Sequence, residues 1–339
     1  MFTKLITGLK AASESREAID NLESRQREVQ GELAMVRAQL ADLSERSLLL
    51  QGRAASRALP RGQRVRDLSE VEFRVFSQWG EDGIIEWLAE HIAVPVERFI
   101  EFGVETFREA NCRFLMQNRN WKGLVFDGSA ANIAALATER AFWMHDLTAK
   151  SAFITAENID GLIRDAGFAG PLGILSIDVD GNDFWIWESI TSVEPAIVIC
   201  EYNPIFGDTR AVTVPYDPEF RRFDAHYSGL YFGASIAALK HLGARKGYTF
   251  VGTNANGINA FFVKDSLAGP LLQLIETPKA FPSRHRDSRD RHGRLSFTAG
   301  LARLALIRDM SVVDVESGHS LSLSEIEQPY SHTWLRGMA

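Results

Sequence analysis

The chain has 339 residues, of which 45% are hydrophobic and 24% are charged, an ordinary composition for a globular protein with one large core and an extension. A net charge of -7 argues against nonspecific nucleic-acid binding, so no nucleic-acid partner is expected. No apolar run is long enough to span a bilayer, and residues 1–10 lack the continuous apolar stretch of a signal peptide. Cys112 and Cys200 lie in apolar surroundings without metal or redox spacing, which indicates reduced core thiols and a cytoplasmic protein.

Residues 1–52 are expected to form a coiled-coil oligomerisation segment. Residues 11–52 contain no proline, and their seam positions alternate by steps of three and four. The seam consists of Ile19, Leu22, Gln26, Val29, Leu33, Val36, Leu40, Leu43, Ser47 and Leu50. The pattern predicts a homo-oligomer, either a dimer or a trimer; the alternative is one long helix packed on its own domain.

Residues 53–68 are rich in arginine and contain Pro60 and Gly62, a composition typical of a linker. The remaining residues, 69–339, are expected to form one domain with a core over 70–265 and a C-terminal extension over 266–339. In this domain the polar segment Ser77–Gly83 precedes an apolar helix, and a helix cap is one explanation for it.

Residues 98–129 predict a strand, a helix and a second strand of a parallel sheet. The first apolar run carries Glu101 and leads into Gly103, and the second ends at Asp127. Ligands of parallel sheets bind at the carboxyl ends of the strands, where these three residues would meet.

The chemistry expected at this edge is nucleoside binding. Gly103 permits a close backbone approach, and Asp127 can accept hydrogen bonds from two ribose hydroxyls. Gly103 does not begin a dinucleotide fingerprint, and the acidic side chains of Glu101 and Glu105 would repel a pyrophosphate. A cationic nucleoside without phosphates fits better, which describes S-adenosylmethionine.

A helix over 130–140 and a third strand over 141–144 follow, so that Asp146 would lie just past the strand end. A turn residue is the alternative interpretation of this aspartate. A further helix is expected over 151–167.

Acidic residues then follow two more predicted strands, over 173–177 and 196–200. Asp178 and Asp180 come after the first of these strands, and Glu201 and Asn203 after the second. Clustered carboxylates are costly unless a cation lies between them, and their hard oxygens suit Mg²⁺ or Mn²⁺. We expect a divalent cation here; the alternatives are a helix cap at Asp180 and carboxylates that hydrogen-bond substrate directly.

Residues 204–230 form a long stretch without clear periodicity, in which aromatic and basic residues suit a carbohydrate. Within it we select His226 as candidate general base and Arg221, Arg222 and Tyr227 as candidate substrate-binding residues, together with Tyr202 just before it. Each of these could instead be an ordinary solvated or hydrogen-bonding residue.

The sheet is expected to finish with a helix over 235–242 and a hairpin over 248–263. In the tail, the arginine-rich segment 284–294 suits either an acidic glycan or solvent. A helix over 301–307 and a strand over 310–315 are expected after it.

The motifs E-F-G-V-E (Glu101–Glu105) and V-F-D-G-S (Val125–Ser129) resemble motifs I and II of class I S-adenosylmethionine-dependent methyltransferases. S-Q-W-G-E-D-G (Ser77–Gly83) and I-D-V-D-G-N-D (Ile177–Asp183) resemble the FkbM-type group, whose members O-methylate sugars. The resemblance spans residues 70–265. It departs from many relatives in having a single glycine in the first loop.

The resemblance implies a Rossmann-like α/β fold with a mostly parallel seven-stranded sheet and helices on both faces. It places Gln78 over the methionine end of the cofactor, Gly128 and Ser129 beside the ribose, and Asp146 on the adenine. It also implies that Asp178 takes part in catalysis, because some sugar O-methyltransferases of this fold use a metal to bind two vicinal hydroxyls and acidify one.

The expected function is O-methylation of a sugar hydroxyl with S-adenosylmethionine, capping a surface polysaccharide with assistance from a divalent cation. A coiled coil before such a domain resembles polysaccharide-capping methyltransferases, which suggests membrane-associated polysaccharide assembly proteins as partners at the inner face of the membrane. The alternatives are a methyltransferase of small natural products or nucleotide sugars, and an inactive scaffold assembled through its coiled coil.

Overall fold

The computed structural model describes residues 2–338, and within its first helix it describes side chains for Arg16, Ile19 and every residue from Asn21 onward. The chain divides after Gln51 into two compact units. No described helix is both long and apolar enough to cross a membrane.

The described residues of the first unit are helical. Helix α1 (Phe2–Ala58) covers residues 2–52 of the segment expected to be a coiled coil, so the helical structure of these residues is confirmed, whereas their association stays a prediction. The apolar seam side chains from Ile19 to Leu50 that are described are exposed, for example Leu22 at 66% and Leu40 at 60%. These apolar side chains are therefore not covered by the described part of the chain.

The second unit is built on a seven-stranded sheet with the order β3-β2-β1-β4-β5-β8-β7. The strands are β1 (Arg98–Phe102), β2 (Lys122–Asp127), β3 (Leu147–Ser151), β4 (Gly170–Ile177), β5 (Val193–Glu201), β7 (Tyr248–Thr253) and β8 (Asn259–Lys264). Strands β1 to β5 pair in parallel, and β8 pairs antiparallel with both β5 and β7. This order, with an antiparallel strand inserted next to the last, confirms the predicted Rossmann-like methyltransferase fold.

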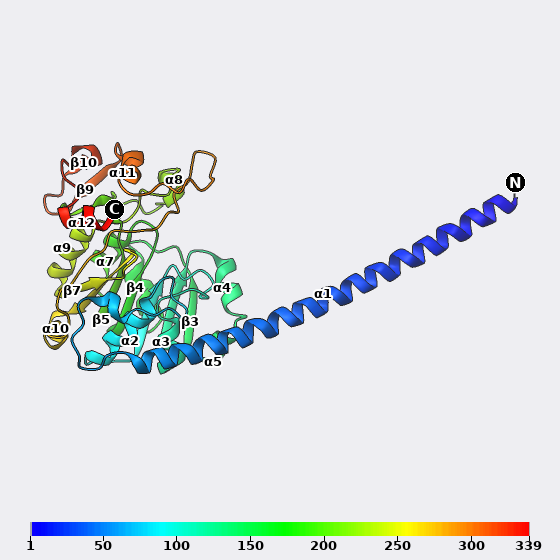
Figure 1. The fold of residues 1–339 in the computed structure, drawn as a ribbon, viewed down its shortest axis with the longest axis horizontal. Coiled ribbons are helices and arrows are strands. Elements are labelled where there is room, and N and C mark those ends of the chain that lie inside the picture. Colours follow the sequence, from blue (N-terminus) through cyan, green and yellow to red (C-terminus); the bar gives the residue numbers. More distant parts are fainter. Residues whose placement is uncertain (1, 339) are drawn as a thin grey trace. The chain divides into compact units, whose positions relative to one another are not determined.

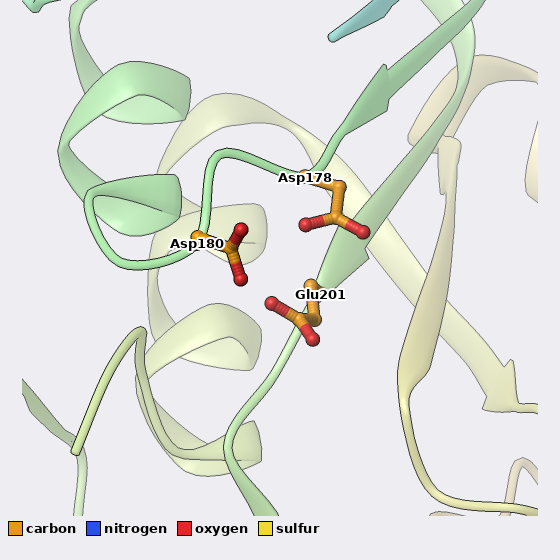
Figure 2. Close-up of side chains that lie close together, drawn as sticks. All are labelled: Asp178, Asp180 and Glu201. Carbon is orange, nitrogen blue, oxygen red and sulfur yellow. The ribbon is translucent and has the colours of Figure 1, made fainter. Parts of the chain in front are cut away.

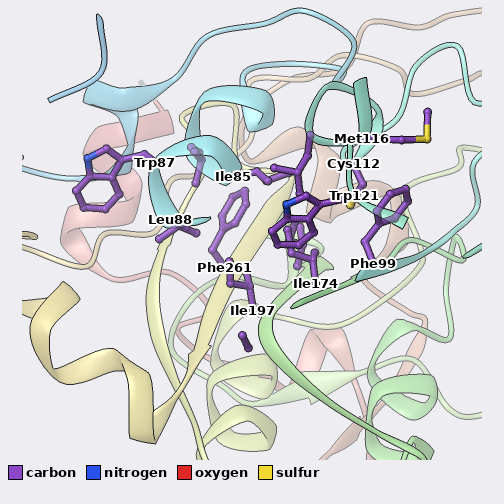
Figure 3. Packing of buried hydrophobic residues seen from close by; sticks show 14 of the residues in the cluster. Ile85, Trp87, Leu88, Phe99, Cys112, Met116, Trp121, Ile174, Ile197 and Phe261 are labelled. Atoms are coloured by element: carbon purple, nitrogen blue, oxygen red, sulfur yellow. The ribbon is translucent and has the colours of Figure 1, made fainter. Parts of the chain in front are cut away.

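Helices cover both faces of the sheet (Figure 1). One face carries α2 (Glu81–His91), α3 (Arg113–Arg119), α4 (Ala130–Leu136), α5 (Arg140–Met144) and α10 (Asp265–Leu272). The other carries α6 (Ile159–Asp165), α7 (Asp183–Ser189) and α9 (Ile236–Lys246). On the first face, fully buried side chains such as Trp87, Leu88 and Phe261 pack together (Figure 3), which stabilises the sheet by removing apolar surface from water.

The third strand is not where the sequence predicted it. Residues 141–144 belong to helix α5, and the strand β3 follows at Leu147–Ser151. Trp143 is 70% exposed, so the apolar run that suggested a strand lies on the surface. The true strand is an edge strand, and its polar sequence carries little strand signal.

Residues 53–60 of the expected linker belong to the second unit and contact its helices. Ser56, in the last turns of α1, donates a hydrogen bond to Glu86, and Arg53 donates one to the carbonyl of Gln117. The indole nitrogen of Trp87 donates to the carbonyl of Pro60 at 3.0 Å. Local composition does not reveal such contacts with distant helices.

The C-terminal extension joins the long stretch after β5 to form a second layer of structure. Strands β6 (Val212–Thr213), β9 (Ser311–Asp314) and β10 (Ser320–Ser322) make an antiparallel sheet in the order β10-β9-β6. Around it lie α8 (Arg222–Ala225), α11 (Ala302–Ile307) and α12 (His332–Met338), with the short helices η2 (Pro204–Phe206) and η3 (Leu323–Glu325); η1 (Leu68–Val71) precedes α2. Figure 1 shows this part, in orange and red, on the same side of the domain as α8.

Candidate functional site

One cavity of about 430 Å³ opens at the carboxyl edge of the parallel strands. Its walls come from the ends of β1, β2, β4 and β5, from the residues after β3, and from residues 283–303 of the C-terminal extension. The predicted site residues that line it are Gln78, Glu101, Gly103, Asp127, Gly128, Asp178, Asp180, Glu201, Tyr202, Asn203 and Arg222. Residues that lie far apart in the sequence thus share one site of the size that small ligands occupy.

Gly103 is where the loop after β1 comes closest to the loop after β4. Its φ is +71°, and a Cβ atom on it would lie 1.9 Å from the carbonyl oxygen of Asp178. Only glycine adopts this conformation at this distance without displacing backbone. The single glycine of the first loop is therefore required by packing across the two strand ends.

The side chain of Asp127, at the end of β2, holds the loops after β1 and β2 together. Its Oδ2 accepts a hydrogen bond from the backbone nitrogen of Glu105 at 2.8 Å, and its Oδ1 accepts from Ser129 N and Asn132 Nδ2. Ser129 in turn caps helix α4 by accepting a hydrogen bond from Asn132 N, and it does not line the cavity. An ionised carboxylate offers about four acceptor positions, so Asp127 keeps capacity for a ligand hydroxyl.

Glu101 lines the cavity but is buried, and its carboxyl group bonds to backbone. Its two carboxyl oxygens accept hydrogen bonds from the backbone nitrogens of Asn111 and Cys112, at 2.6 Å and 3.0 Å. Burial raises the pKa of the Glu101 carboxyl to about 7, although these hydrogen bonds oppose the shift. Glu101 therefore shapes the cofactor loop by holding the start of α3.

The carboxylates of Asp178, Asp180 and Glu201 converge at the ends of β4 and β5 (Figure 2). One oxygen of each lies within 4.8 Å of an oxygen of the others. Asp183, the last acid of the run, turns away and accepts hydrogen bonds from Val179 N and Gly181 N. It stabilises the turn in which Asp180 has a φ of +56°, an uncommon conformation that aims this side chain at the cluster.

The acid cluster is electrostatically unfavourable as it stands. Burial, followed by the charges of Asp180 and Asp183, raises the pKa of Asp178 well above its ordinary value. Burial and the charge of Asp178 do the same to the pKa of Glu201, whose Oε2 is buried without a hydrogen-bond partner. A cation bound between these groups would remove both penalties.

Arg222 supplies part of that positive charge from the chain itself. Its guanidinium pairs with Asp180 at 3.1 Å and with Asp287 at 3.0 Å, and it stacks on Phe232 with 3.8 Å to the ring centroid. The carboxylates of Glu201 and Asp180 raise the pKa of Arg222 although burial opposes its charge. Arg222, which was expected to bind substrate, therefore lies beside the acid cluster and neutralises part of its negative charge.

Two residues next to the cluster, Asn203 and Tyr202, make hydrogen bonds to the backbone of the protein. The Asn203 oxygen accepts a hydrogen bond from Ile205 N, and its amide nitrogen donates to the carbonyls of Leu230 and Phe232. The Tyr202 hydroxyl donates to the carbonyl of Phe281, and its ring is fully buried. These hydrogen bonds give Asn203 and Tyr202 structural roles, while metal ligation by Asn203 and substrate binding by Tyr202 stay predictions.

Three further predicted residues lie away from the cavity. The His226 Nδ1 pairs with the hydroxyl of Ser228 at 2.7 Å, and its ring packs on Tyr227; neither residue lines the cavity. Burial, and then the charge of Arg291, lowers the pKa of His226. Arg221 is exposed and lies over the ring of Phe153. The general-base assignment of His226 and the substrate-binding assignments of Arg221 and Tyr227 are therefore not supported by position.

Asp146 was assigned to the wrong edge of the sheet. It precedes β3, pairs with Lys122 at the start of β2, and has a side chain that is 65% exposed. The residues that do follow β3 into the cavity are Ala152, Phe153 and Ile154. The adenine assignment of Asp146 was wrong because the strand lies several residues later than expected.

Sequence reasoning missed Asn259, which faces the cavity from β8. Its amide nitrogen donates to the buried Glu81 at 2.9 Å, and Asn254 donates to the same carboxylate oxygen. Asn259 lines the cavity next to Glu201 across the β5–β8 pairing, and its buried oxygen has no hydrogen-bond partner among the described residues. Glu81 belongs to the Ser77–Gly83 motif, so this motif positions a cavity residue besides starting helix α2.

Residues of the C-terminal extension were also missed. Ser283, His285, Asp287 and Arg303 line the cavity from the side opposite the sheet. The arginine-rich composition of 284–294 drew attention to this segment, but no sequence pattern indicated that it returns to the strand ends.

Comparisons with known proteins add little beyond the fold. No known family's sequence profile matches the chain, and no curated protein matches it. An O-methyltransferase from Bacillus cereus, solved with SAH, has a TM-score of 0.36 at 13% identity, covering 65% of this chain and 90% of that one. An S-adenosylmethionine-dependent methyltransferase from Clostridium acetobutylicum has a TM-score of 0.34 at 7% identity, covering 54% of this chain and 90% of that one. We assign the fold from its strand order.

Proposed function

We propose that the chain is an S-adenosylmethionine-dependent O-methyltransferase that acts on a sugar hydroxyl, assisted by a divalent cation. One observation carries this proposal: a single cavity joins the Gly103–Asp127 loops, which suit a nucleoside, to the acid cluster of Asp178, Asp180 and Glu201. The cofactor and the acceptor would then meet across the ends of β1 and β4.

The residues at the first end fit the cofactor. Gly103 lets the loop after β1 lie against the Asp178 carbonyl at the cavity, and Asp127 keeps acceptor capacity for a ribose hydroxyl at the end of β2. The acidic surroundings favour a cation over a pyrophosphate. When bound, S-adenosylmethionine supplies a methyl group on a positively charged sulfur.

The residues at the second end fit a divalent cation. Carboxylate oxygens from two strand ends are hard ligands, and the unpartnered Glu201 Oε2 is available to one. When bound, such a cation lowers the pKa of a coordinated hydroxyl. Asp178 lines the cavity beside the proposed cation site, so it is better placed than His226 to receive the acceptor proton.

We extend the proposal to a surface polysaccharide as acceptor and to a homo-oligomer formed through α1, with membrane-associated polysaccharide assembly proteins as partners at the cytoplasmic face. The exposed seam of α1 supports association. A small natural product or nucleotide sugar is the alternative acceptor, and an inactive scaffold is the alternative to an enzyme.

The test is methyl transfer from methyl-labelled S-adenosylmethionine, with Mg²⁺ or Mn²⁺ present, to a panel of monosaccharides, nucleotide sugars and bacterial polysaccharides. We expect label in carbohydrate that resists mild alkali, because a methyl ether is stable where a methyl carboxylate ester is not. Asp178→Asn should abolish the transfer, whereas Asp146→Asn at the opposite edge should retain it. Label confined to small molecules would favour the alternative acceptor, and no transfer with any acceptor would contradict enzyme activity.

A further inference from the structure

Arg303 is a buried cation on the wall of the cavity opposite the sheet. It lies on α11, only 4% of its surface is exposed, and it lines the cavity. Its terminal nitrogens donate to the carbonyl oxygens of Ser283 at 2.8 Å and His285 at 3.3 Å, while its Nε has no partner. The guanidinium is thus held in place by neutral acceptors and keeps an unused donor.

The charge of Arg303 is only partly balanced within the part of the chain that the structure describes, because Asp287 acts on it electrostatically without forming an ion pair with it. Arg222, the other arginine of this cavity, contacts two carboxylates, whereas no described carboxylate forms an ion pair with Arg303. A buried charge without a counter-ion is costly, and the cost falls when an anion binds beside it. Arginine also offers a planar fork of donors that matches carboxylate and phosphate oxygens.

Contacts run without interruption from the acid cluster to Arg303. Arg222 bridges Asp180 and Asp287, Asp287 lies 3.7 Å from the His285 ring, and the His285 carbonyl accepts from Arg303. All of these residues line the same cavity. A ligand that spans this cavity could therefore place a hydroxyl at the acid cluster and an anionic group at Arg303.

We propose that Arg303 binds an anionic group of the acceptor, a carboxylate or a phosphate, so that the acceptor is an acidic or phosphorylated sugar. This inference rests on the proposed function and narrows its substrate class. It assigns anion recognition to one buried arginine rather than to the segment 284–294, where Arg294 already pairs with Asp290 and is 74% exposed.

The experiment measures binding of inorganic phosphate, D-glucuronate and D-glucose to the full chain by ligand-dependent thermal stabilisation at constant ionic strength. Wild type should be stabilised by phosphate, by glucuronate or by both, and the responding anion identifies the chemistry of the group. Arg303→Met should weaken that binding by roughly 10- to 100-fold, the loss expected for hydrogen bonds to a charged group. The matched control, Arg294→Met, should respond as wild type does.

Several outcomes would overturn the inference. The wild type could show no stabilisation by either anion, or equal stabilisation by glucose. The Arg303→Met variant could be stabilised as much as wild type, or the Arg294→Met variant could lose as much stabilisation as Arg303→Met. If Arg303→Met does not fold by circular dichroism, Arg303→Lys provides the test. It keeps the charge but not the fork, and it should retain weakened anion binding; unchanged binding would contradict recognition by the guanidinium.

Titration of S-adenosylmethionine in the same preparations separates this inference from the proposed function. Arg303→Met should bind S-adenosylmethionine as wild type does, because Arg303 lies at the acceptor end. A wild type that binds the anion but not S-adenosylmethionine would overturn the proposed function and leave the anion site standing.

Discussion

At the scale of single residues, Gly103 connects the cofactor loop to the acid cluster. Gly103→Ala should weaken S-adenosylmethionine binding by at least about 10-fold, because the new Cβ would displace the Asp178 carbonyl and the positive φ would be strained. Isothermal titration calorimetry measures the effect. The control is Gly161→Ala in α6, where no atom lies within 4 Å of the added carbon. Equal affinity in Gly103→Ala and wild type would contradict the loop contact.

Cation binding should depend on pH in a direction that the buried carboxyls determine. Burial raises the pKa values of Asp178 and Glu201, so in the cation-free protein these groups keep their protons to higher pH than ordinary carboxyls do. Because a cation must displace those protons, Mn²⁺ affinity should rise with pH and should weaken on acidification at a pH above that at which ordinary carboxyls titrate. Electron paramagnetic resonance of free Mn²⁺ gives the affinity at each pH.

Glu201→Gln removes one carboxylate of the cluster and should abolish most of the Mn²⁺ binding. Asp146→Asn, an exposed position on the other edge of the sheet, should leave it intact. Binding that is flat across the pH range and unaffected by Glu201→Gln would show that the cluster does not hold a cation.

Four of the predicted site residues that line the cavity share one property. Gly103, Asp127, Asp178 and Glu201 each end a short apolar run, and the carboxyl ends of parallel strands meet at one edge. Asp146 does not follow a strand, because the apolar run around Trp143, which was predicted to be a strand, is a surface helix. Arg303 and Asn259 could not be predicted, because no local sequence pattern indicates which distant segments return to the cavity.

At the scale of elements, the amino terminus of α2 is tied to β8 through Glu81. Its carboxylate accepts hydrogen bonds from Trp79 N, Gly80 N, Asn254 and Asn259. Glu81→Gln replaces one acceptor by a donor, so at least one of these buried donors loses its partner. Urea titrations should give the variant a free energy of unfolding about 1–3 kcal/mol lower than that of wild type.

The same substitution should also loosen the Asn259 oxygen from its position beside Glu201. A positioning role predicts weaker Mn²⁺ binding in Glu81→Gln, whereas Glu70→Gln, at an exposed position of η1, should change neither stability nor affinity appreciably. Loss of stability without any change in Mn²⁺ affinity would restrict Glu81 to a structural role.

The elements that could be predicted were those with strong periodicity or full burial. Strands β1, β2, β4 and β5 are continuous apolar runs, and the β7–β8 hairpin has turn residues between its strands. The small sheet of β6, β9 and β10 could not be predicted, because β6 is two residues long and pairs with a strand about a hundred positions later. Such pairing depends on tertiary contacts rather than on local pattern.

At the scale of the whole molecule, the seam of α1 should join copies of the chain. In a parallel pair Glu32 of one helix would face Arg37 of the other across the seam, an attractive contact. Leu40→Asp should shift the chain to monomer in sedimentation velocity, because a charge would be buried at a seam position. Met35→Asp, which alters an exposed apolar residue off the seam, should remain associated. A monomeric wild type would contradict association through α1.

The most direct test of the whole account is calorimetric titration of S-adenosylmethionine into wild type, Asp127→Ala and Asp146→Ala. Asp127 lines the cavity at the end of β2, whereas Asp146 lies at the opposite edge of the sheet. We expect wild type and Asp146→Ala to bind with the same affinity and Asp127→Ala to lose binding by roughly 10-fold or more, because ribose hydroxyls lose a charged acceptor. Absence of binding to wild type, or equal binding by all three proteins, would contradict the assignment of this cavity to S-adenosylmethionine.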